Sequence, residues 1–234
     1  GPDEAEKGEL ASVAAQIVMK VLYAARAVRL DLLRAVQGLA RCMTKWTRRS
    51  DAELFRLMAY IDTTVELRLV GWVGDEMKDI HPHLYSDADF AGCQQTQKST
   101  SGMYACLKGP RTSFPISAYS KRQNCVSTST TEAEMVAAAN ALNTAGTPLL
   151  AVLETICAAR SLRLPTLQIR LDNTAMIEII RTGRNLTMRH LGRTRGVNIA
   201  WLHEQCARES VAMSYVPSAH MVADMYTKPI TDGA

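Results

Sequence analysis

The sequence predicts an α/β fold in which a mixed sheet of five strands carries flanking helices and follows a small helical segment. Apolar residues recur at helical spacing through residues 1–80, and short β-type runs alternate with helical stretches from residue 81 onward. The predicted order of this second part is three strands, a helix, a strand, two helices, a strand and a helix. This order favours antiparallel pairing of the early strands and right-handed crossovers between the later ones. We therefore expect two domains, residues 1–80 and residues 81–234.

The bulk composition is that of a protein that can bury a core. The chain has 234 residues, of which 47% are hydrophobic and 21% charged, and its net charge is +4. No apolar run reaches the roughly 20 residues that cross a bilayer, and no signal-peptide pattern opens the chain, so we expect no membrane partner. The start at Gly1-Pro2, without an initiator Met, indicates a piece of something longer. Scattered cysteines without a Cys-x-x-Cys pair favour reduced thiols and an intracellular location.

The first domain is predicted to be mainly helical. An apolar stretch from Leu10 to Ala25 and a periodic stretch from Leu30 to Met43 predict two helices. Ser50 followed by Glu53 predicts a capping box at the start of a third helix. β-type residues at 65–73 then predict a strand before the join to the second domain.

The second domain is predicted to contain five strands and four helices. The strands are expected at 83–87, 102–107, 114–119, 167–171 and 211–216, and the helices at about 132–159, at 173–181, at 197–208 and from 222 onward. The turn-rich residues 108–111 predict a hairpin between the second and third strands. Gly146 and Pro148 predict an interruption of the first, long helix.

Four acidic residues stand where such a fold would gather them. Asp87 lies on the first strand, Glu134 in the first turn of the long helix, Asp172 at the end of the fourth strand, and Asp224 at the start of the last helix. Taken singly, the last three are better explained as caps or as acids favoured by the helix dipole. Together they favour a site for Mg²⁺ or Mn²⁺, because these ions prefer carboxylate oxygens. Two such ions about 4 Å apart would stabilise the attacking and leaving oxygens when a phosphodiester is cut.

Several motifs are shared, in order, with a known family. They are Asp87-Ala88-Asp89-Phe90-Ala91-Gly92-Cys93, Lys98-Ser99-Thr100-Ser101-Gly102, Ser120-Lys121-Arg122-Gln123, Thr131-Glu132-Ala133-Glu134, Asp172-Asn173, Arg193-Thr194-Arg195, Ala223-Asp224 and Thr227-Lys228. From Leu84 to Pro229 the chain thereby resembles the ribonuclease H domain of copia-type LTR retrotransposon Pol polyproteins. The resemblance implies a ribonuclease H-like fold for the second domain.

The first domain resembles, less closely, the tail of the reverse transcriptase region that precedes ribonuclease H in this family. The similar segments are Leu22–Ala25, Val28–Leu32 and Leu57–Ile61. The family has Arg-Pro-Asp where this chain has Arg29-Leu30-Asp31. It also has a basic Arg-Tyr-Leu-Lys-Gly-Thr where this chain has Ala-Tyr-Ile-Asp-Thr-Thr at residues 59–64. No Tyr-x-Asp-Asp motif is present, so polymerisation does not occur on this chain alone.

The resemblance implies hydrolysis of the RNA strand of RNA–DNA hybrids, leaving 3′-hydroxyl and 5′-phosphate ends. The family's catalytic and metal-binding quartet falls on Asp87, Glu134, Asp172 and Asp224, with Asp87 bridging both metals. The implied cofactors are two Mg²⁺ ions, with Mn²⁺ as an alternative. The implied partners are the hybrid and the reverse transcriptase portion of the same polyprotein, in a cytoplasmic particle and in the nucleus.

Other polar residues are candidates for contacts with nucleic acid. The predicted set is Ser86, Asn173, Arg181, Arg184, Arg189, Arg193 and Arg195. The five arginines lie in a stretch without Asp or Glu, which favours contacts with phosphates, whereas Ser86 and Asn173 are equally explained as turn or cap residues. His220, four residues before Asp224, is a candidate for product release, although a surface role is favoured. The family's His after the Arg-Thr-Lys motif is replaced by Gly196.

Two other functions are compatible with these residues. One is a catalytically inactive, nucleic-acid-binding remnant of a retrotransposon polyprotein that keeps the fold and the acids. The other is an integrase core, which also carries acids on strands. Integrases use three acids that end with a helix-borne Glu, whereas here the motif-matched Glu134 comes second, which disfavours this alternative.

Overall fold

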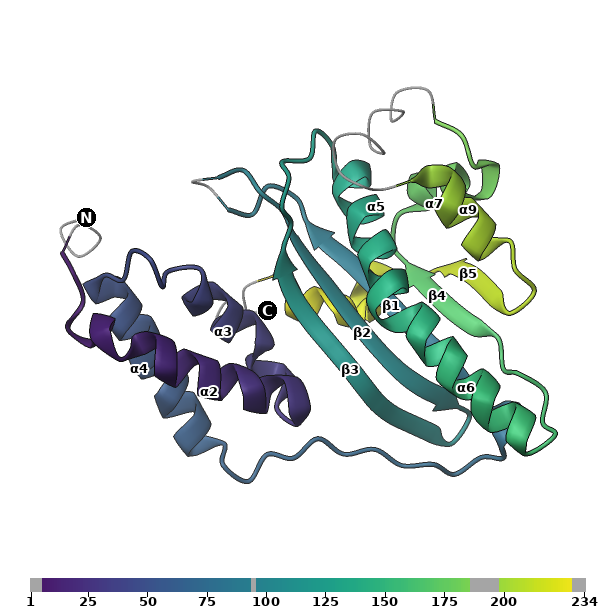
Figure 1. Cartoon of the computed structure of the whole chain (residues 1–234), viewed down its shortest axis with the longest axis horizontal. Coiled ribbons are helices and arrows are strands. Elements are labelled where there is room, and N and C mark those ends of the chain that lie inside the picture. Colours follow the sequence, from purple (N-terminus) through teal and green to yellow (C-terminus); the bar gives the residue numbers. More distant parts are fainter. Residues whose placement is uncertain (1–5, 94–95, 186–197, 229–234) are drawn as a thin grey trace. The chain divides into compact units, whose positions relative to one another are not determined.

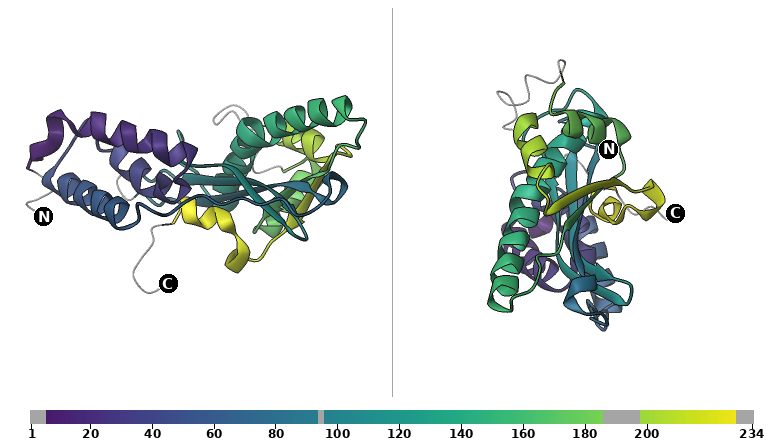
Figure 2. Two further views of the ribbon diagram at one scale, coloured as in Figure 1. Left: turned by 90° about the horizontal axis from the view of Figure 1, so that it is seen from below. Right: turned by 90° about the vertical axis from the view of Figure 1, so that its right-hand side faces the viewer.

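The computed structural model describes residues 6–93, 96–185 and 198–228, which belong to two compact units (Figure 1, Figure 2). Unit 1 lies within residues 1–69, and unit 2 is Val70–Lys228. The segment 70–80 therefore belongs with the second unit. Trp72 and Ser113 hold it there by exchanging backbone hydrogen bonds of 3.0 and 3.1 Å. This isolated bridge replaces the strand predicted at 65–73, and that prediction was wrong.

Unit 1 is a small group of helices whose apolar faces are buried. Its elements are η1 (Glu9–Ser12), α2 (Ala14–Ala27), η2 (Leu30–Leu32), α3 (Leu33–Ala40) and α4 (Arg48–Thr63). α2 packs on α3, and α3 packs on α4. The buried side chains recur at helical spacing, with Leu33, Val36 and Leu39 on α3 and Leu54 and Leu57 on α4.

The start of α4 differs from the predicted capping box. Thr47, not Ser50, is the N-cap residue, because it has the extended backbone that this position requires (φ −118°, ψ 170°). The Thr47 side chain accepts a hydrogen bond from Ser50 N, and Ser50 Oγ accepts one from Thr47 N, both at 3.4 Å. Glu53, the predicted partner, instead forms an ion pair with Arg49 at 3.1 Å.

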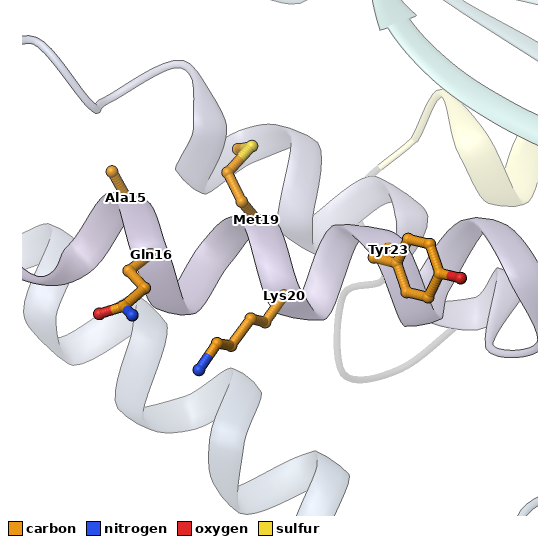
Figure 3. A pocket seen from close by; sticks show the side chains of 5 residues that line it. All are labelled: Ala15, Gln16, Met19, Lys20 and Tyr23. Atoms are coloured by element: carbon orange, nitrogen blue, oxygen red, sulfur yellow. The ribbon is translucent and has the colours of Figure 1, made fainter.

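The surface of α2 carries a shallow depression lined by Ala15, Gln16, Met19, Lys20 and Tyr23 (Figure 3). Tyr23 is 81% exposed and Met19 is 46% exposed, so this face lies outside the apolar interior of unit 1. The lining contains one cation and no acid. It therefore lacks the ligands of a metal site.

Unit 2 is built on a sheet with the strand order β3-β2-β1-β4-β5. The strands are β1 (His81–Asp89), β2 (Thr100–Gly109), β3 (Thr112–Arg122), β4 (Leu167–Leu171) and β5 (Val211–Tyr215). β1, β2 and β3 pair antiparallel, whereas β4 runs parallel to both β1 and β5. Each strand predicted in this domain overlaps an observed one. The predicted mixed sheet, antiparallel first and parallel later, is confirmed.

Helices connect and cover these strands. They are η3 (Met77–Asp79), α5 (Thr130–Ala141), η4 (Leu142–Gly146), α6 (Thr147–Ala159), α7 (Thr174–Thr182), α9 (Ile199–Cys206), η5 (Ser218–His220) and η6 (Val222–Tyr226). α5 packs on β1 and β2, and η6 packs on the same two strands. α5 is buried almost all round, so it is the central helix of unit 2.

The long helix is not interrupted at Gly146 and Pro148. A π-helical turn, η4, joins α5 and α6 into one helix from Thr130 to Ala159. Proline lacks an N–H and clashes with the preceding turn of a regular α-helix, and the wider π turn relieves this conflict. A Cβ on Gly146 would lie 3.0 Å from Leu84 Cδ2, so glycine allows the helix to approach the sheet closely.

This joined helix is long and apolar enough, by length and composition alone, to cross a membrane. Its most apolar window has a mean hydropathy of 1.3, and 50% of that window is buried inside unit 2. The burial is that of a core helix, because α5 lies on the sheet.

The two faces of the sheet have different contents. On the α5 face lies the main core, which includes Leu84, Met103 and Met135. On the other face, Tyr85 and Cys106 form a smaller cluster with Met221 and Ala223 from the C-terminal segment. Because successive residues of a strand point to opposite faces, Asp87 shares the second face with Tyr85.

Candidate metal centre

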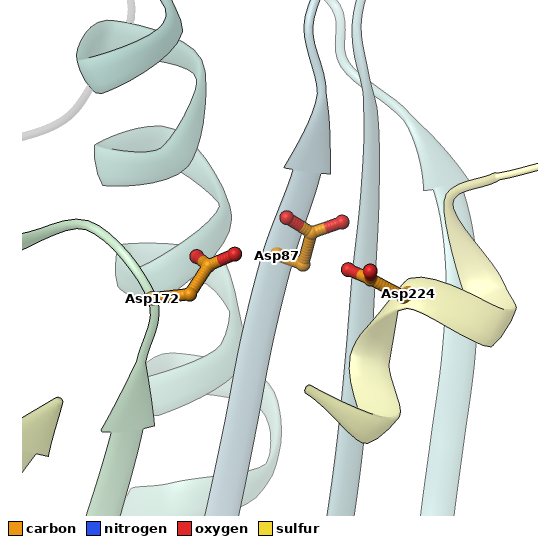
Figure 4. A group of neighbouring side chains, drawn as sticks. All are labelled: Asp87, Asp172 and Asp224. Atoms are coloured by element: carbon orange, nitrogen blue, oxygen red, sulfur yellow. The ribbon is translucent and has the colours of Figure 1, made fainter. Parts of the chain in front are cut away.

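Three carboxylates from three segments converge on this second face of the sheet. Asp87 lies on β1, Asp172 follows the last residue of β4, and Asp224 lies on η6 (Figure 4). One oxygen atom from each lies within 4.8 Å of the other two. Strand pairing explains the meeting of the first two. β1 and β4 run parallel with Tyr85 opposite Arg170, so the residues two positions later on each chain segment come side by side.

Gly102 allows η6 to bring Asp224 to the other two carboxylates. It lies opposite Asp87 on β2. A Cβ at this position would lie 2.7 Å from both Ala223 O and Thr227 Cγ2. A larger residue would therefore push the C-terminal segment off the sheet.

Asp87 is the most enclosed member of the group. It is 4% exposed, and it accepts a hydrogen bond from Oγ1 of Thr227, which is itself fully buried. Burial raises the pKa of Asp87 to about 6; the Thr227 hydrogen bond opposes the rise, and the charges of Asp224 and Asp172 add to it. A cation among the three carboxylates would reverse this cost.

Glu134 lies beside this group without belonging to it. It is 8% exposed and occupies the second turn of α5, one turn deeper than predicted, because Ser129 caps the helix. Its Oε2 is buried and has no hydrogen-bond partner in the described residues. Burial raises the pKa of Glu134 to about 7; Asn173 opposes the rise, and the charges of Asp172 and Asp87 add to it. The structure thus groups three of the four predicted carboxylates and places the fourth within their electrostatic reach.

The residues present fit divalent cations. Lys228 Nζ lies 2.5 Å from Asp224 Oδ2, but one ammonium balances only one of four acids. Asp224 Oδ1 is buried without a hydrogen-bond partner in the described residues, as is Oε2 of Glu134. Carboxylate oxygens in this number are the hard ligands that Mg²⁺ and Mn²⁺ take.

The other predicted residues near the site have different positions. Ser86 is 3% exposed and points to the α5 face, because neighbours on a strand alternate, so it lies on the opposite face from the group of three carboxylates. Asn173 caps α7 by accepting a hydrogen bond from Met176 N at 2.9 Å. His220 is exposed at the end of η5. Of these three, only Asn173 acts on a carboxylate of the site, through its effect on Glu134.

The predicted arginine stretch is described only in part. Arg181 is exposed and pairs with Glu178 at 2.9 Å, and Arg184 is exposed beyond the end of α7. Outside the described residues lie Arg189, Arg193 and Arg195. Phosphate contacts by this stretch therefore stay a prediction.

A buried polar network behind the site was not expected from the sequence. Gln123 Nε2 donates to Ser101 Oγ at 2.9 Å and to Ala133 O at 2.8 Å. The fully buried Glu132 accepts from Thr128 N at 2.6 Å. These bonds fix the first turn of α5 and thereby the helix that carries the fourth acid.

The sequence contained a signal for these supporting residues. Gln123, Glu132 and Thr227 all lie inside the shared motifs, where they flank or follow the acids. Their roles were missed because only the tertiary structure shows which backbone or carboxylate atom each side chain meets.

Comparison with known protein sequences finds a similar polyprotein. No protein-family model matches this chain. The chain is 27% identical over 229 residues to the retrovirus-related Pol polyprotein from transposon TNT 1-94 of Nicotiana tabacum. The match covers 96% of this chain but 16% of that polyprotein, so the chain spans about a sixth of the length of its relative. The predicted resemblance to a retrotransposon Pol polyprotein is confirmed.

Comparison with solved structures adds ribonuclease H domains, each 14% identical to this chain. The N-terminal ribonuclease H domain of a Mycobacterium tuberculosis protein, solved as a fusion with maltose-binding protein, covers 63% of this chain and 91% of its own, with a TM-score of 0.42. LC11 ribonuclease H1, isolated from compost, covers 63% and 92% with a TM-score of 0.38. The same protein in complex with an RNA/DNA hybrid covers 62% and 93% with a TM-score of 0.38.

Proposed function

We propose that unit 2 is the ribonuclease H of a retrotransposon Pol polyprotein and hydrolyses the RNA strand of RNA–DNA hybrids with two divalent metal ions. The observation that carries this proposal is the convergence of Asp87, Asp172 and Asp224, whose oxygens lie within 4.8 Å of one another. Glu134 adds a buried acid beside them. The sequence similarity to a Pol polyprotein supports the choice of substrate.

Each carboxylate has a part in this proposal. Asp87, Glu134, Asp172 and Asp224 would hold two Mg²⁺ or Mn²⁺ ions. Such ions activate a water molecule and stabilise the attacking and leaving oxygens of an in-line displacement. Thr227 orients one oxygen of Asp87 by donating a hydrogen bond to it. Burial raises the pKa of Glu134 to about 7 and that of Asp87 to about 6, so Glu134 is partly protonated at neutral pH and would release its proton when the cations bind.

The wider context is part of the proposal. Unit 1 would be the end of the reverse transcriptase region, and the polymerase would belong to the same polyprotein. A polymerase that copies RNA into DNA makes the hybrid that unit 2 would cut. We place this activity inside the cell, in a cytoplasmic particle and in the nucleus.

Cleavage of a labelled RNA–DNA hybrid tests the proposal. We expect wild type to cut the RNA strand only when Mg²⁺ or Mn²⁺ is present, and Asp87→Asn to lose at least a hundredfold in rate while still folding. Glu154→Gln is the matched control, because it removes an exposed acid of α6 without touching the metal group. It should cut like wild type.

The same assay separates the proposal from an inactive remnant. A remnant would bind the hybrid but cut nothing at any metal concentration, and this outcome would refute the proposed activity. Equal cleavage by wild type and Asp87→Asn would show that the activity comes from elsewhere.

A further inference from the structure

A second group of polar side chains lies on the same face of the sheet as the carboxylates, toward the start of β1. His81 lies opposite Lys108 on β2, and Tyr85 lies opposite Arg170 on β4, with His83 between them on β1. Alternate residues of a strand share a face, and directly paired residues point the same way. We call His81, His83, Lys108 and Arg170 the basic row.

Three nitrogen atoms of the basic row are buried and lack hydrogen-bond partners among the described residues. They are Nδ1 of His81, Nδ1 of His83 and Nε of Arg170. Arg170 also donates from Nη1 to Ser214 Oγ at 2.9 Å, so its guanidinium is held with Nε free. Nε of Arg170 is a donor, and a buried donor without an acceptor costs about 1–3 kcal/mol, whereas the two Nδ1 atoms donate or accept according to the histidine tautomer.

The charges of the basic row are not balanced. In the described part of the chain, neither Arg170 nor Lys108 forms an ion pair, and Lys108 Nζ instead donates to the Tyr85 hydroxyl at 2.9 Å. After burial, the groups that lower the pKa of His83 are Arg170, Lys108 and His81, all of them basic. The row therefore combines the positive charges of Lys108 and Arg170 with the unmet donor of Arg170, which favours an anionic, oxygen-rich ligand.

We propose that the basic row binds backbone phosphates of the nucleic acid whose strand is cut at the carboxylates. The inference rests on the proposed function and extends its substrate contacts to a second place. Arg170 precedes Asp172 by two residues, about 7 Å along the chain, and His81 precedes Asp87 by six, about 20 Å. Phosphates of one duplex strand advance about 3.4 Å along the axis, so the row lies roughly two to six base pairs from the cut.

The phosphates that the row would bind and the phosphates next to the metal group do not form one continuous track across the sheet. Met221 and Ala223 pack with Tyr85 and Cys106, which pair with Arg170 and His83, whereas Lys108 lies two residues farther along β2. The phosphates next to the scissile bond therefore belong to the carboxylate end, and those farther along the strand belong to the row.

Salt-dependent binding of an RNA–DNA hybrid tests the row. Binding is measured on the whole chain with Ca²⁺ in place of Mg²⁺, so that the hybrid is not cut. Lys108→Gln and Arg170→Gln should each weaken binding roughly fivefold at low salt and reduce the slope of log affinity against log salt by about 1. Arg170→Lys, which keeps the charge, should restore the slope. Arg163→Gln, which removes an exposed arginine before β4, should change neither quantity.

Hybrid length gives an independent readout. A hybrid that ends two base pairs beyond the cut on the side of the row, and keeps its full length on the other side, cannot reach Lys108, so Lys108→Gln should bind it as well as wild type does. An unchanged salt slope in both Gln variants with the long hybrid would overturn the inference. Tighter binding of an acidic peptide of equal charge than of the hybrid would overturn it too, because the row would then serve a protein partner.

The two proposals fail separately. Normal cleavage with salt slopes unaffected by Lys108→Gln and Arg170→Gln would refute the row and leave the ribonuclease intact. Row-dependent binding without cleavage by wild type would refute the ribonuclease and leave the row as a nucleic-acid site.

Discussion

Asp87 is the only buried member of the group of three carboxylates, and both of its neighbours in that group are also negative. The residue that makes this arrangement tolerable is Thr227, whose hydroxyl donates to Asp87 Oδ2. A hydrogen bond to a charged acceptor stabilises the ionised form, which is the form that binds a metal. Thr227 therefore stabilises the ionised form of Asp87 that would hold a cation.

Replacing Thr227 by Val removes this hydroxyl and keeps the branched shape of the side chain. Hydrogen bonds to charged groups contribute about 1.5–3 kcal/mol, so Mg²⁺ affinity at pH 7 should fall roughly tenfold or more. The pKa of Asp87 will rise, so the deficit should shrink at pH 8.5, where Asp87 is ionised in both proteins. Calorimetric titration at the two pH values measures this. Thr227→Ser should bind like wild type, and an equal deficit at both pH values would contradict the assigned role.

His83 gives a prediction about acid stability. Burial and the neighbouring Arg170, Lys108 and His81 lower its pKa from 6.5 to about 4. Below pH 6.5 the unfolded chain therefore binds a proton that the folded chain does not. The stability that depends on neutral His83 is fully present above pH 6.5 and is lost as the pH falls through 4.

Thermal denaturation between pH 7 and pH 4.5 checks this sign. His83→Gln cannot take up the proton, so its melting temperature should fall less over this range than that of wild type. His220→Gln is the control, because His220 is exposed in a 3-10 turn, and it should follow the wild-type curve. A His83→Gln curve parallel to wild type would show that His83 titrates normally.

At the scale of elements, β2 and the C-terminal segment fit closely against each other. Gly102 has no side chain, and its backbone lies against Ala223 and Thr227 of that segment. The position of Asp224 therefore depends on a residue that has no chemistry of its own.

Gly102→Ala should uncouple the sheet from η6. The added methyl group would lie 2.7 Å from Ala223 O, so the segment must move, and small displacements of catalytic groups cost about a hundredfold in rate. We expect the cleavage rate to fall by that order while the far-ultraviolet circular dichroism is retained. Gly38→Ala in α3 is the matched control, since its nearest neighbour lies 4.0 Å away. That change should stabilise unit 1 by about 0.5–1 kcal/mol and leave cleavage unchanged.

The sequence predicted elements well where local pattern decides them and poorly where packing does. β4 was placed correctly, because apolar and polar residues alternate from Leu167 to Leu171, and this alternation is typical of a half-buried strand. The strand expected at 65–73 is absent except for the bridge at Trp72, since β-type residues form a strand only when a sheet edge is available to pair with them. An interruption was predicted at Gly146 and Pro148, but the chain forms a π-helical turn there and α6 continues the same helix.

The site shows the same division. All four acids and their order could be predicted from the sequence. Ser86 was expected at the site only because it is next to Asp87 in the sequence. Strand alternation places it on the opposite face from Asp87. Thr227 and Gly102 went unrecognised because their roles exist only once β1, β2 and η6 are packed together.

At the scale of the whole molecule, the boundary between the units decides which residues unit 2 needs to be stable. The segment 70–80 is bonded to the β2–β3 hairpin: Arg111 N donates to Asp75 Oδ2 at 2.7 Å, and Gly74 N donates to Thr112 Oγ1 at 3.1 Å. With the Trp72 bridge, these bonds cover the end of the hairpin.

A fragment that begins at residue 70 should therefore be more stable than one that begins at residue 81. Several hydrogen bonds of about 1 kcal/mol each are lost in the shorter fragment, of which we expect about 2 kcal/mol to appear in the free energy of unfolding. For a domain of this size the melting temperature should differ by roughly 4–8 °C. Asp75→Ala in the longer fragment should give an intermediate value. Equal melting temperatures for the two fragments would place the boundary after residue 80.

The distribution of the four acids along the chain has a consequence for synthesis. Asp87, Glu134 and Asp172 leave the ribosome well before Asp224 and Thr227, which dock on β1 and β2 only when the last described residues have emerged. Chains fold as they are made, at about 5–20 residues per second, so the sheet and α5 can assemble while the centre still lacks its final ligand. A nascent chain at that stage cannot assemble the complete centre. The centre that we propose is therefore complete only after the chain has been translated past residue 227 and this segment has left the ribosome.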